Sequence, residues 1–597
     1  MSEAAQHSTR ELIGALQEAI ARQDHALDEI VSFISRLRFE LDNDARVLTE
    51  GASSLEDTPF DDPFPLVRVA SACFDCRSRS EAQGIVAQVA RHSNPKEVIL
   101  ALEETLAELR DVEQDRDSDA ETALYALYAY VQAYETCLRR LKTAKLDKFY
   151  STAFETLSSM ITHFVIEGTL SARIDDPDSA GHVDLDLIEA IFELATSVRC
   201  IEGTQQKQAA QVTARALIET VVGLVGPLIS SDNANELFLT LYPRYRRITP
   251  PDLASSEREL VANRIWTCVF PKLFASLDYR ADDLLVAIRF SDPLKRIGSF
   301  SILSHHLAIN PSTPISTFDL DDSPATPSFL LSATLETVRR SLLPHTAYRL
   351  AEDDVLFFVW WCVDQQEKLG DLAAAGLGEE TLYPLIEVTS SLAALSPNPK
   401  TRFLAFRLLA TLVLHHCGTS TAAEVTQLAL LKDLVTESAT PAFRAACIGI
   451  VREVLDLKFE TNSGSTTSIF LSGALLDELE PALLRHAPRN LFEPGISPEA
   501  FLEEHERAVS QKLNFCFFLL TRDRENKTGV RSSSTLERIK VNLIDPLGTY
   551  LSRWLDDPRV DAVGGARVDP TISLELELVR TSLRRVEEAF NVATGEA

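Results

Sequence analysis

The sequence predicts an all-α protein, an irregular α-solenoid in which helix pairs stack in the manner of HEAT and armadillo repeats. At 597 residues the chain is too long for one ordinary hydrophobic core, which leaves several domains or one elongated stack of helices. Its 22 glycines are few for this length, and sheet-rich folds use glycine in their turns and bulges. Apolar residues recur at helical spacing in nearly every ordered segment, and no segment shows the sustained alternation expected of a strand.

The first half of the chain divides into a series of expected helices. The earliest, 8–49, places apolar residues such as Leu12 and Leu16 on one broad face. A loop rich in aspartate and proline follows at 57–65. Further helices are predicted at 95–112, 120–142, 146–167, 183–199, 207–230, 253–276 and 281–290.

A segment rich in proline, serine and threonine, Ala308–Ser328, separates the two halves of the sequence. Such a segment cannot bury enough apolar surface to offset the entropy that it loses on ordering, so we expect a disordered linker. The expected organisation is an N-terminal helical repeat region at 1–307, the linker at 308–328 and a C-terminal helical repeat region at 329–597.

The clearest internal repeat lies in the second half. Pro399 and Pro441 each open a segment in which an arginine follows three residues later and small residues follow the arginine. Proline suits the first turn of a helix because its missing N–H would have no partner there. The two arginines, Arg402 and Arg444, are 42 residues apart, which lies within the ~40–47-residue period of HEAT and armadillo units. A weaker echo of the pattern surrounds Arg68.

The chain is acidic, with 58 Lys and Arg against 88 Asp and Glu and a formal net charge of −30. Such a chain repels phosphate backbones, so we expect no direct nucleic-acid binding and consider basic protein surfaces the more suitable partners. No uninterrupted apolar run reaches the ~18 residues of a membrane span, and no secretory signal is visible. Nine cysteines without a regular spacing favour a reducing compartment, so we expect a soluble cytoplasmic protein that also reaches the nucleus.

No constellation of residues supports catalysis, and we expect neither an enzyme nor a bound cofactor or metal. The sequence contains no glycine-rich phosphate loop, nucleophile elbow, zinc-protease helix or kinase signature. Cys73 and Cys76 have redox spacing but lack a preceding strand or a second pair, which leaves a redox protein as a distant alternative. Three aromatic or histidine pairs are expected to pack locally or in the core: His305-His306, His415-His416 and Trp360-Trp361.

The most distinctive polar feature is a charged segment between two apolar runs, Leu519–Arg531. The residues before it, Leu513–Leu520, are apolar at every position except Asn514, and helical spacing of apolar residues resumes from Leu536. The connector is about a dozen residues long and carries charges of both signs, and this length exceeds that of a usual connection between two helices. This surplus of polar residues makes the segment the first candidate for a functional site.

Three passages of the second half have an order and spacing that we recognise from a known family. They are Pro399–Leu409, Leu431–Leu455 and Leu513–Gly529, the last followed by Asp545–Leu547. In these passages the chain resembles the glomulin family, which includes the plant aberrant-lateral-root-formation protein and the fungal YAP-binding proteins. The likeness covers about residues 380–555, whereas the N-terminal half is similar only in being helical and acidic.

The resemblance implies a HEAT-like α-solenoid without catalytic activity. In animals and plants the family is associated with cullin–RING ubiquitin ligases, where C-terminal repeats cover the RING subunit's surface for the conjugating enzyme and inhibit ubiquitin transfer. Fungal members are linked instead to an oxidative-stress transcription factor of the basic-zipper type, whose activation by peroxide they support. We therefore expect a protein partner, either a RING or cullin subunit or, as the alternative, a basic-zipper stress factor.

Six residues of the charged segment are predicted to contact this partner because they combine charge and expected exposure within the matching passages. They are Arg522, Arg524, Glu525, Asn526, Lys527 and Arg531. The alternative is a structural role for the segment, in which Asp523 or Asn526 caps a helix end and Gly529 supplies a positive φ.

Overall fold

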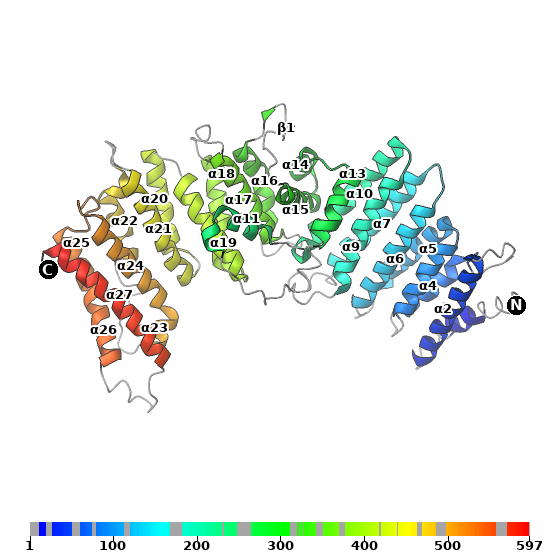
Figure 1. The fold of residues 1–597 in the computed structure, drawn as a ribbon, viewed down its shortest axis with the longest axis horizontal. Coiled ribbons are helices and arrows are strands. Elements are labelled where there is room, and N and C mark those ends of the chain that lie inside the picture. Colours follow the sequence, from blue (N-terminus) through cyan, green and yellow to red (C-terminus); the bar gives the residue numbers. More distant parts are fainter. Residues whose placement is uncertain are drawn as a thin grey trace. The chain divides into compact units, whose positions relative to one another are not determined.

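The computed structural model shows a chain that is helical almost throughout (Figure 1). It contains two compact units, Met1–Gln365 and Gln366–Ala597. The residues that the structure describes are 11–18, 27–49, 60–74, 79–112, 120–166, 182–229, 232–246, 264–310, 319–320, 323–324, 326–341, 350–368, 377–416, 420–438, 440–461, 468–484, 497–556 and 570–595.

Unit 1 is built from two layers of helices that contact one another in chain order within each layer (Figure 1). The first layer contains α3 Pro63–Cys73, α5 Pro95–Val112, α7 Leu146–Ile166, α10 Thr204–Val225 and α15 Pro293–Ile309. The second layer contains α2 Leu27–Thr49, α4 Arg79–His92, α6 Ala120–Arg140, α9 His182–Thr196 and α13 Phe270–Leu277. Contacts such as α3 with α4 and α5 with α6 join the layers, which confirms the predicted all-α solenoid.

The remaining described elements of unit 1 are shorter or lie towards its C-terminal end. They are η3 Ser197–Cys200, η4 Gly226–Ile229, α11 Asn233–Leu241, η5 Pro243–Tyr245, the π-helical η6 Ile265–Val269, α14 Ala281–Phe290, β1 Asp319–Leu320, β2 Ser323–Pro324, α16 Pro327–Ser341 and most of α17 Glu352–Lys368. The two short strands pair in antiparallel fashion.

The observed division of the chain differs from the predicted one at 1–307, 308–328 and 329–597. It falls inside α17, after Gln365, so the predicted linker belongs to unit 1. The helices α15 and α16 reach into the ends of that segment and contact each other, and β1 and β2 lie between them. Its remaining positions are outside the described residues. Linker composition records a break between helices, but it carries no information on whether the helices on either side pack together.

Unit 2 continues the all-α architecture with helices of more varied length. Its described elements are α18 Glu379–Leu395, α19 Pro399–Thr411, the π-helical η9 Leu412–His416, α20 Thr421–Thr436, α21 Pro441–Thr461, η10 Ile469–Leu471, α22 Ala474–Leu483, α23 Pro498–Glu504, α24 Glu506–Arg522, α25 Ser533–Ile539, the π-helical η12 Lys540–Ile544, α26 Asp545–Asp556 and α27 Pro570–Thr594. Adjacent helices pair, as α18 does with α19 and α20 with α21, and α24 packs between α21 and α27.

Many helices begin with a polar capping residue followed by proline. The side chains of Asp62, Asp292, Asn398 and Ser497 each accept a hydrogen bond from a backbone N–H of the first helical turn, and a proline follows each of them. The cap satisfies one of the N–H groups that lack a partner inside the helix, and the proline removes another. The sequence analysis used this chemistry at Pro399 but placed a loop at 57–65, whereas α3 already begins at Pro63.

The predicted repeat around Arg402 and Arg444 has a structural cause. Nη1 of Arg402 donates to the carbonyl oxygen of Ser396 at 2.6 Å, and Nη1 of Arg444 donates to that of Ser438 at 3.0 Å. Both carbonyls follow the end of the preceding helix, where backbone acceptors lack helical partners. Arg68, in the weaker echo, pairs instead with glutamates of α5, so it does not repeat this contact.

Unit 1 contains the same local contact, because Nε of Arg296, on α15, donates to the carbonyl oxygen of Ser291, directly after α14. Two further arginines of unit 1 reach helix ends from distant parts of the chain. Arg140 of α6 donates to the carbonyl oxygens of Ala90 and Ser93, at the end of α4. Nε of Arg215, on α10, donates to the carbonyl oxygen of Leu277 at 2.8 Å, at the end of α13. These contacts join helices of different repeats.

The helices α10 and α15 approach each other closely at Gly298. A Cβ atom added at Gly298 would overlap the backbone carbonyl of Glu219, on α10. Since backbone lies against backbone at this crossing, only glycine fits there. The crossing joins two helices of the first layer of unit 1.

Candidate interaction surface

The charged segment folds into a closed turn between α24 and α25, and its base is the side chain of Asp523. This carboxylate is 1% exposed. Its Oδ1 accepts a hydrogen bond from the N–H of Lys527 at 2.8 Å, and its Oδ2 accepts from the N–H and the hydroxyl of Thr528 at 2.8 and 2.7 Å. Because Thr528 is also fully buried, one carboxylate satisfies three donors and holds the two ends of the 523–528 segment together.

Two residues of the turn have left-handed backbone conformations, Asn526 with φ 57° and Gly529 with φ 79°. The side-chain oxygen of Asn526 accepts from the N–H of Arg531 at 2.7 Å. Nη2 of Arg531 in turn donates to the carbonyl oxygen of Leu520 at 2.6 Å, in the last turn of α24. Ser532 then caps α25. Gly529 supplies the positive φ that the sequence analysis held as an alternative, whereas Asn526 fixes the turn without capping a helix.

The structure places the six candidate residues in two groups. The first group holds the turn in place and consists of Arg522, Asn526 and Arg531. Asn526 and Arg531 do so through the hydrogen bonds given above. Arg522 lies 3.3 Å from a carboxylate oxygen of Asp456 and 3.5 Å from one of Glu460, both on α21. The other three candidates form the exposed tip of the turn, and they are Arg524, Glu525 and Lys527.

The tip presents charges of both signs on a closed base. Nζ of Lys527 lies 2.9 Å from a carboxylate oxygen of Glu525, and their side chains are 42% and 75% exposed. The side chain of Arg524 makes no ion pair or hydrogen bond within the part of the chain that the structure describes. Arginine is enriched among residues that dominate binding energy at interfaces, so Arg524 is the member of the tip best suited to contact a partner.

One exposed residue near the turn escaped the sequence analysis. Val541, in the π-helical segment after α25, is 54% exposed. Val541 lies two residues from both Ile539 and Leu543, which are buried, so helical spacing places it on the opposite, exposed face. A nearby ion pair between Arg538 and Glu480, at 2.8 Å, connects α25 to α22 and was also not predicted.

The inner face of α24 carries two buried titratable groups directly before the turn. Burial raises the pKa of the Cys516 thiol to about 12 and lowers the pKa of the Lys512 ammonium to about 8. A thiol with so high a pKa has almost no thiolate at neutral pH, so Cys516 is a packing residue.

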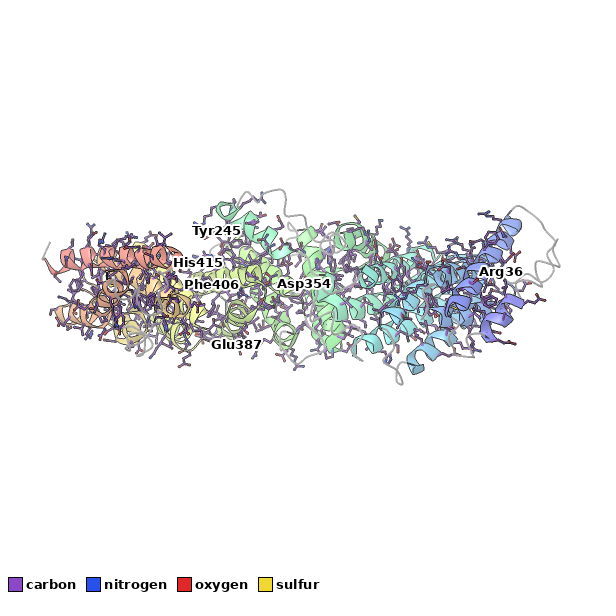
Figure 2. All side chains as sticks on the ribbon, turned by 90° about the horizontal axis from the view of Figure 1, so that it is seen from below. Arg36, Tyr245, Asp354, Glu387, Phe406 and His415 are labelled. Atoms are coloured by element: carbon purple, nitrogen blue, oxygen red, sulfur yellow. The ribbon has the colours of Figure 1, made fainter. Side chains whose placement is uncertain are left out.

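The histidine doublet of α15 packs in the interior of unit 1. Nε2 of His305 lies 3.1 Å from Oδ1 of Asp354, the residue labelled in Figure 2, and the ring of His305 stacks on Trp266 with 3.3 Å between ring centroids. The ring of His306 stacks on Phe274 at 4.7 Å. Within the described ranges, no group of three or more His, Cys, Asp or Glu residues is placed to hold a metal ion.

The other residues that the sequence analysis singled out lie in the core, on the surface or outside the described residues. Trp360 and Trp361 are each 1% exposed, which confirms that they pack in the core. His415 is exposed, so the expected local packing of that doublet is not seen at this position. Cys73 is buried in α3, while Cys76 lies outside the described residues. No described helix is both long enough and apolar enough to span a bilayer.

The charged turn lies inside a region that matches a family model. The model of the uncharacterised protein family YAP/Alf4/glomulin matches residues 66–173 and 322–565, which together make up more than half of the chain. The chain belongs to the YAP/Alf4/glomulin family. Membership confirms the resemblance and extends it beyond 380–555, because the N-terminal half contains a matched segment of its own. It also supports a role in protein interaction.

Two further comparisons add little. No curated protein was found to match the chain. Among solved structures, a circular tandem repeat protein with novel repeat topology and enhanced subunit contact surfaces aligns over 98% of each chain, at 13% identity and a TM-score of 0.21. The fold class therefore depends on the helix stacking described above.

Proposed function

We propose that this protein is a non-enzymatic regulator that binds the RING subunit of a cullin–RING ubiquitin ligase through unit 2. Binding would cover the RING surface for the conjugating enzyme and so inhibit ubiquitin transfer by steric occlusion. The observation that carries the proposal is the exposed tip Arg524, Glu525 and Lys527, which stands on a hydrogen-bonded base inside the family-matched region. A loop that is already ordered loses little conformational entropy when it binds.

The tip alone is too small to form the whole interface. A stable protein complex buries about 1,200–2,000 Å² in total, so neighbouring helices of unit 2 must supply most of the contact area. Charged residues at the edge of such an interface mainly set orientation and the rate of association. We therefore assign specificity to the turn and contact area to the helices around it.

The test uses the full-length protein and a reconstituted cullin–RING ligase. We expect direct binding to the RING subunit by calorimetry and a lower rate of ubiquitin transfer when the protein is added. Arg524→Glu should weaken binding at least tenfold, in line with an interface arginine that dominates the energy. The matched control is Arg584→Glu on α27, which makes the same charge change at another exposed position. Absence of binding and of inhibition by the unmodified protein would reject the proposal.

The second candidate is an oxidative-stress scaffold that binds a basic-zipper transcription factor and promotes its activation by peroxide. The formal net charge of −30 favours it, because an acidic protein attracts a cationic basic region at long range. Binding to such a factor that increases with peroxide, together with no affinity for RING or cullin subunits, would select this candidate over the first.

A further inference from the structure

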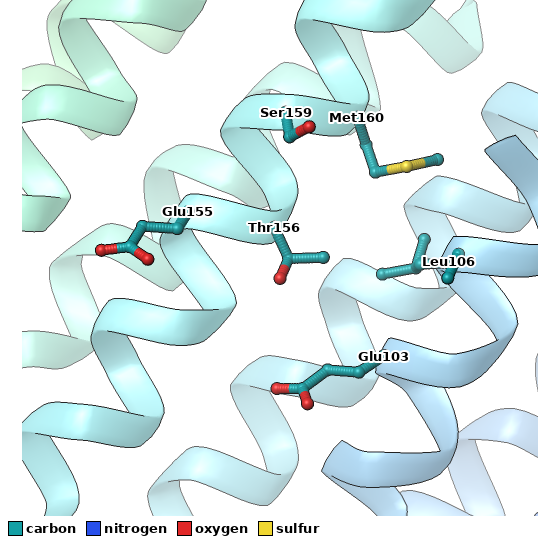
Figure 3. Close-up of a pocket in the computed structure, with 7 residues that line it drawn as sticks. Glu103, Leu106, Glu155, Thr156, Ser159 and Met160 are labelled. Carbon is teal, nitrogen blue, oxygen red and sulfur yellow. The ribbon is translucent and has the colours of Figure 1, made fainter.

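A cavity of about 350 Å³ lies in unit 1 between α5 and α7 (Figure 3). Leu106 and Met160 line its wall and are 0% and 3% exposed. The cavity is therefore a gap in the packing of two neighbouring helices, and this wall offers a partner no exposed apolar surface. An occupied surface lies elsewhere in unit 1, where α11 covers parts of α15 and α17.

The helix α11 lies on an excursion of the chain away from the two layers of unit 1. The excursion leaves after Ile229 and returns by Trp266, and the indole N–H of Trp266 donates to the carbonyl oxygen of Ile229 at 2.5 Å. Tyr245, which follows α11, lies near the upper edge of the view in Figure 2, with Asp354 below it. The two ends of the excursion are therefore held together by a contact in which α11 takes no part.

Two polar contacts fix the N-terminal end of α11. The N–H of Ala234 donates to Oδ1 of Asp353, on α17, at 3.1 Å. The side-chain amide nitrogen of Asn233 lies 3.0 Å from Nδ1 of His305, on α15. Burial and the neighbouring carboxylates of Asp354 and Asp232 raise the pKa of Asp353 well above its ordinary value. The contact therefore covers a carboxyl that water would otherwise solvate, and this cost reduces the net gain from docking.

An aromatic contact fixes the C-terminal half of the segment. The ring centroids of Phe238 and Tyr242 each lie 5.7 Å from that of Trp360, on α17. Trp360 is 1% exposed, yet its indole N–H makes no hydrogen bond within the part of the chain that the structure describes. A buried donor without an acceptor costs free energy. An occupant that supplies an acceptor to this N–H therefore has an advantage over α11.

The helix α11 is weak by its own sequence. It has nine residues, fewer than the ~12–15 below which an isolated helix is marginal in water. Of these nine, only Ala234 and Phe238 are buried. Its helical structure therefore depends on docking, and an element with so few buried side chains opens at a low cost in free energy.

We propose that α11 is a displaceable strap over a binding site for a short helix of a partner protein. The site consists of Asp353, His305 and Trp360, and its present occupant shows what the partner helix must offer. The backbone N–H groups of its first turn would meet Asp353, and two aromatic side chains four residues apart would meet Trp360. The site lies in unit 1 and does not depend on the charged turn of unit 2, so it holds or fails independently of the function proposed above.

The sequence of α11 supplies the probe for this site. A fluorescein-labelled peptide with the sequence of residues 232–246 is titrated into the full-length protein and followed by fluorescence anisotropy. In the unmodified protein the strap competes for the site, whereas Phe238→Ala removes one of the two strap rings that meet Trp360. Because the apparent affinity scales with the fraction of molecules whose site is open, we expect the variant to bind the peptide at least tenfold more tightly than the unmodified protein. The same peptide with alanine in place of both aromatic residues should bind at least tenfold more weakly.

A control variant and a second measurement complete the test. Phe290→Ala, which removes a phenylalanine ring that is 69% exposed on α14, should leave peptide binding unchanged. Hydrogen exchange of the unmodified protein requires no variant, and residues 233–242 should exchange at least tenfold faster than α15 and α17. This measurement decides the question if circular dichroism shows that Phe238→Ala does not fold. Three outcomes would overturn the proposal: equal binding by the unmodified protein and Phe238→Ala, equal binding of the alanine peptide, or protection of α11 equal to that of α15 and α17.

Discussion

Arginines bond to helix-end carbonyls in both units, but they span very different lengths of chain. In unit 1, Arg140 and Arg215 reach carbonyls that are 50 and 62 residues away, whereas Arg296 reaches one 5 residues away. In unit 2, Arg402 and Arg444 reach carbonyls 6 residues away, and Arg531 reaches one 11 residues away. Arginine thus closes a single connector in both units, and among the described residues of unit 1 it also ties one repeat to another.

This difference indicates where a substitution should destabilise each unit most. A contact over a few residues costs little loop-closure entropy and forms with its own helix pair, whereas a contact over 50 residues forms only when two repeats dock. Damage to unit 1 should therefore be most severe where repeats meet. Damage to unit 2 should be most severe where a connector is held by buried polar groups.

The strongest test of the contrast is Gly298→Ala, at the crossing of α10 and α15 in unit 1. The added methyl group would overlap the carbonyl of Glu219, so the two helices must separate. We expect a loss of about 4 kcal/mol or more in the free energy of unfolding, as for severe overpacking of a core. Urea denaturation followed by circular dichroism measures the loss, and hydrogen exchange with mass spectrometry should place it in unit 1.

A matched change in unit 2 should have the opposite sign. Gly449 lies inside α21, and a Cβ atom added there would meet no heavy atom within 4 Å. Gly449→Ala should therefore raise the free energy of unfolding by about 0.5–1 kcal/mol through helix propensity. Destabilisation by both glycine variants would remove the contrast between close packing in unit 1 and open space at this point of unit 2.

The next effect concerns the base of the charged turn. Asp523→Ala removes the acceptor of three hydrogen bonds and leaves buried donors of Thr528 without a partner. We expect a loss of about 3 kcal/mol, since buried bonds to a charged acceptor are the costly ones to break. Hydrogen exchange should increase around the turn between α24 and α25. Glu525→Ala, at the exposed tip, is the control and should change stability by less than about 0.5 kcal/mol.

A pH-dependent effect follows from the contacts between repeats in unit 1. Burial raises the pKa of Glu219 to about 7, and the neighbouring Lys295 and Arg215 oppose this rise only in part. The folded carboxyl therefore holds its proton above the ordinary value of 4.5, so its stabilising effect is full below pH 4.5 and is lost as the pH rises towards 7. We expect the unmodified protein to lose about 2 kcal/mol over this range relative to Glu219→Gln. Denaturation of both proteins at several pH values measures the difference, and parallel pH profiles would contradict it.

The smallest destabilisation should come from the local connectors of unit 2. Arg444→Glu removes the hydrogen bond to Ser438 and places a carboxylate beside the same carbonyl. We expect a loss of about 1–2 kcal/mol from one connector, and a similar loss for Arg402→Glu because its bond to Ser396 is equivalent. Thermal melting followed by circular dichroism provides the measurement. An unchanged melting temperature in both variants would show that the repeated arginines do not hold the connectors.

The contrast also explains what the sequence could and could not predict. Arg402 and Arg444 follow a proline at constant spacing, so a contact over 6 residues left a readable repeat. Arg215 left no such trace, because its partner is 62 residues away and depends on how the repeats dock. The bounds of α5 were predicted well, and there the capping residue Asn94 and Pro95 mark the start of the helix. The division between the two units was not predicted, because it depends on how helices pack across the 308–328 segment.

The candidate site shows the same limit at the scale of single residues. Charge and polarity located the turn, and Arg524, Glu525 and Lys527 are exposed as predicted. Arg522 has the same charge as Arg524 and lies two residues before it, but it pairs with Asp456 of α21. Residue type alone does not reveal which arginine faces another helix and which faces solvent, because that depends on the tertiary arrangement.

The hydrogen-bonded base of the charged turn has one further consequence. The hydrogen bonds from Thr528 to Asp523 and from Arg531 to Leu520 close the loop below its tip, without the side chains of Arg524, Glu525 or Lys527. Those three side chains can therefore be exchanged while the scaffold keeps its shape. Such a position lets a protein change the identity of its target by point substitution, without rebuilding the helices that carry it.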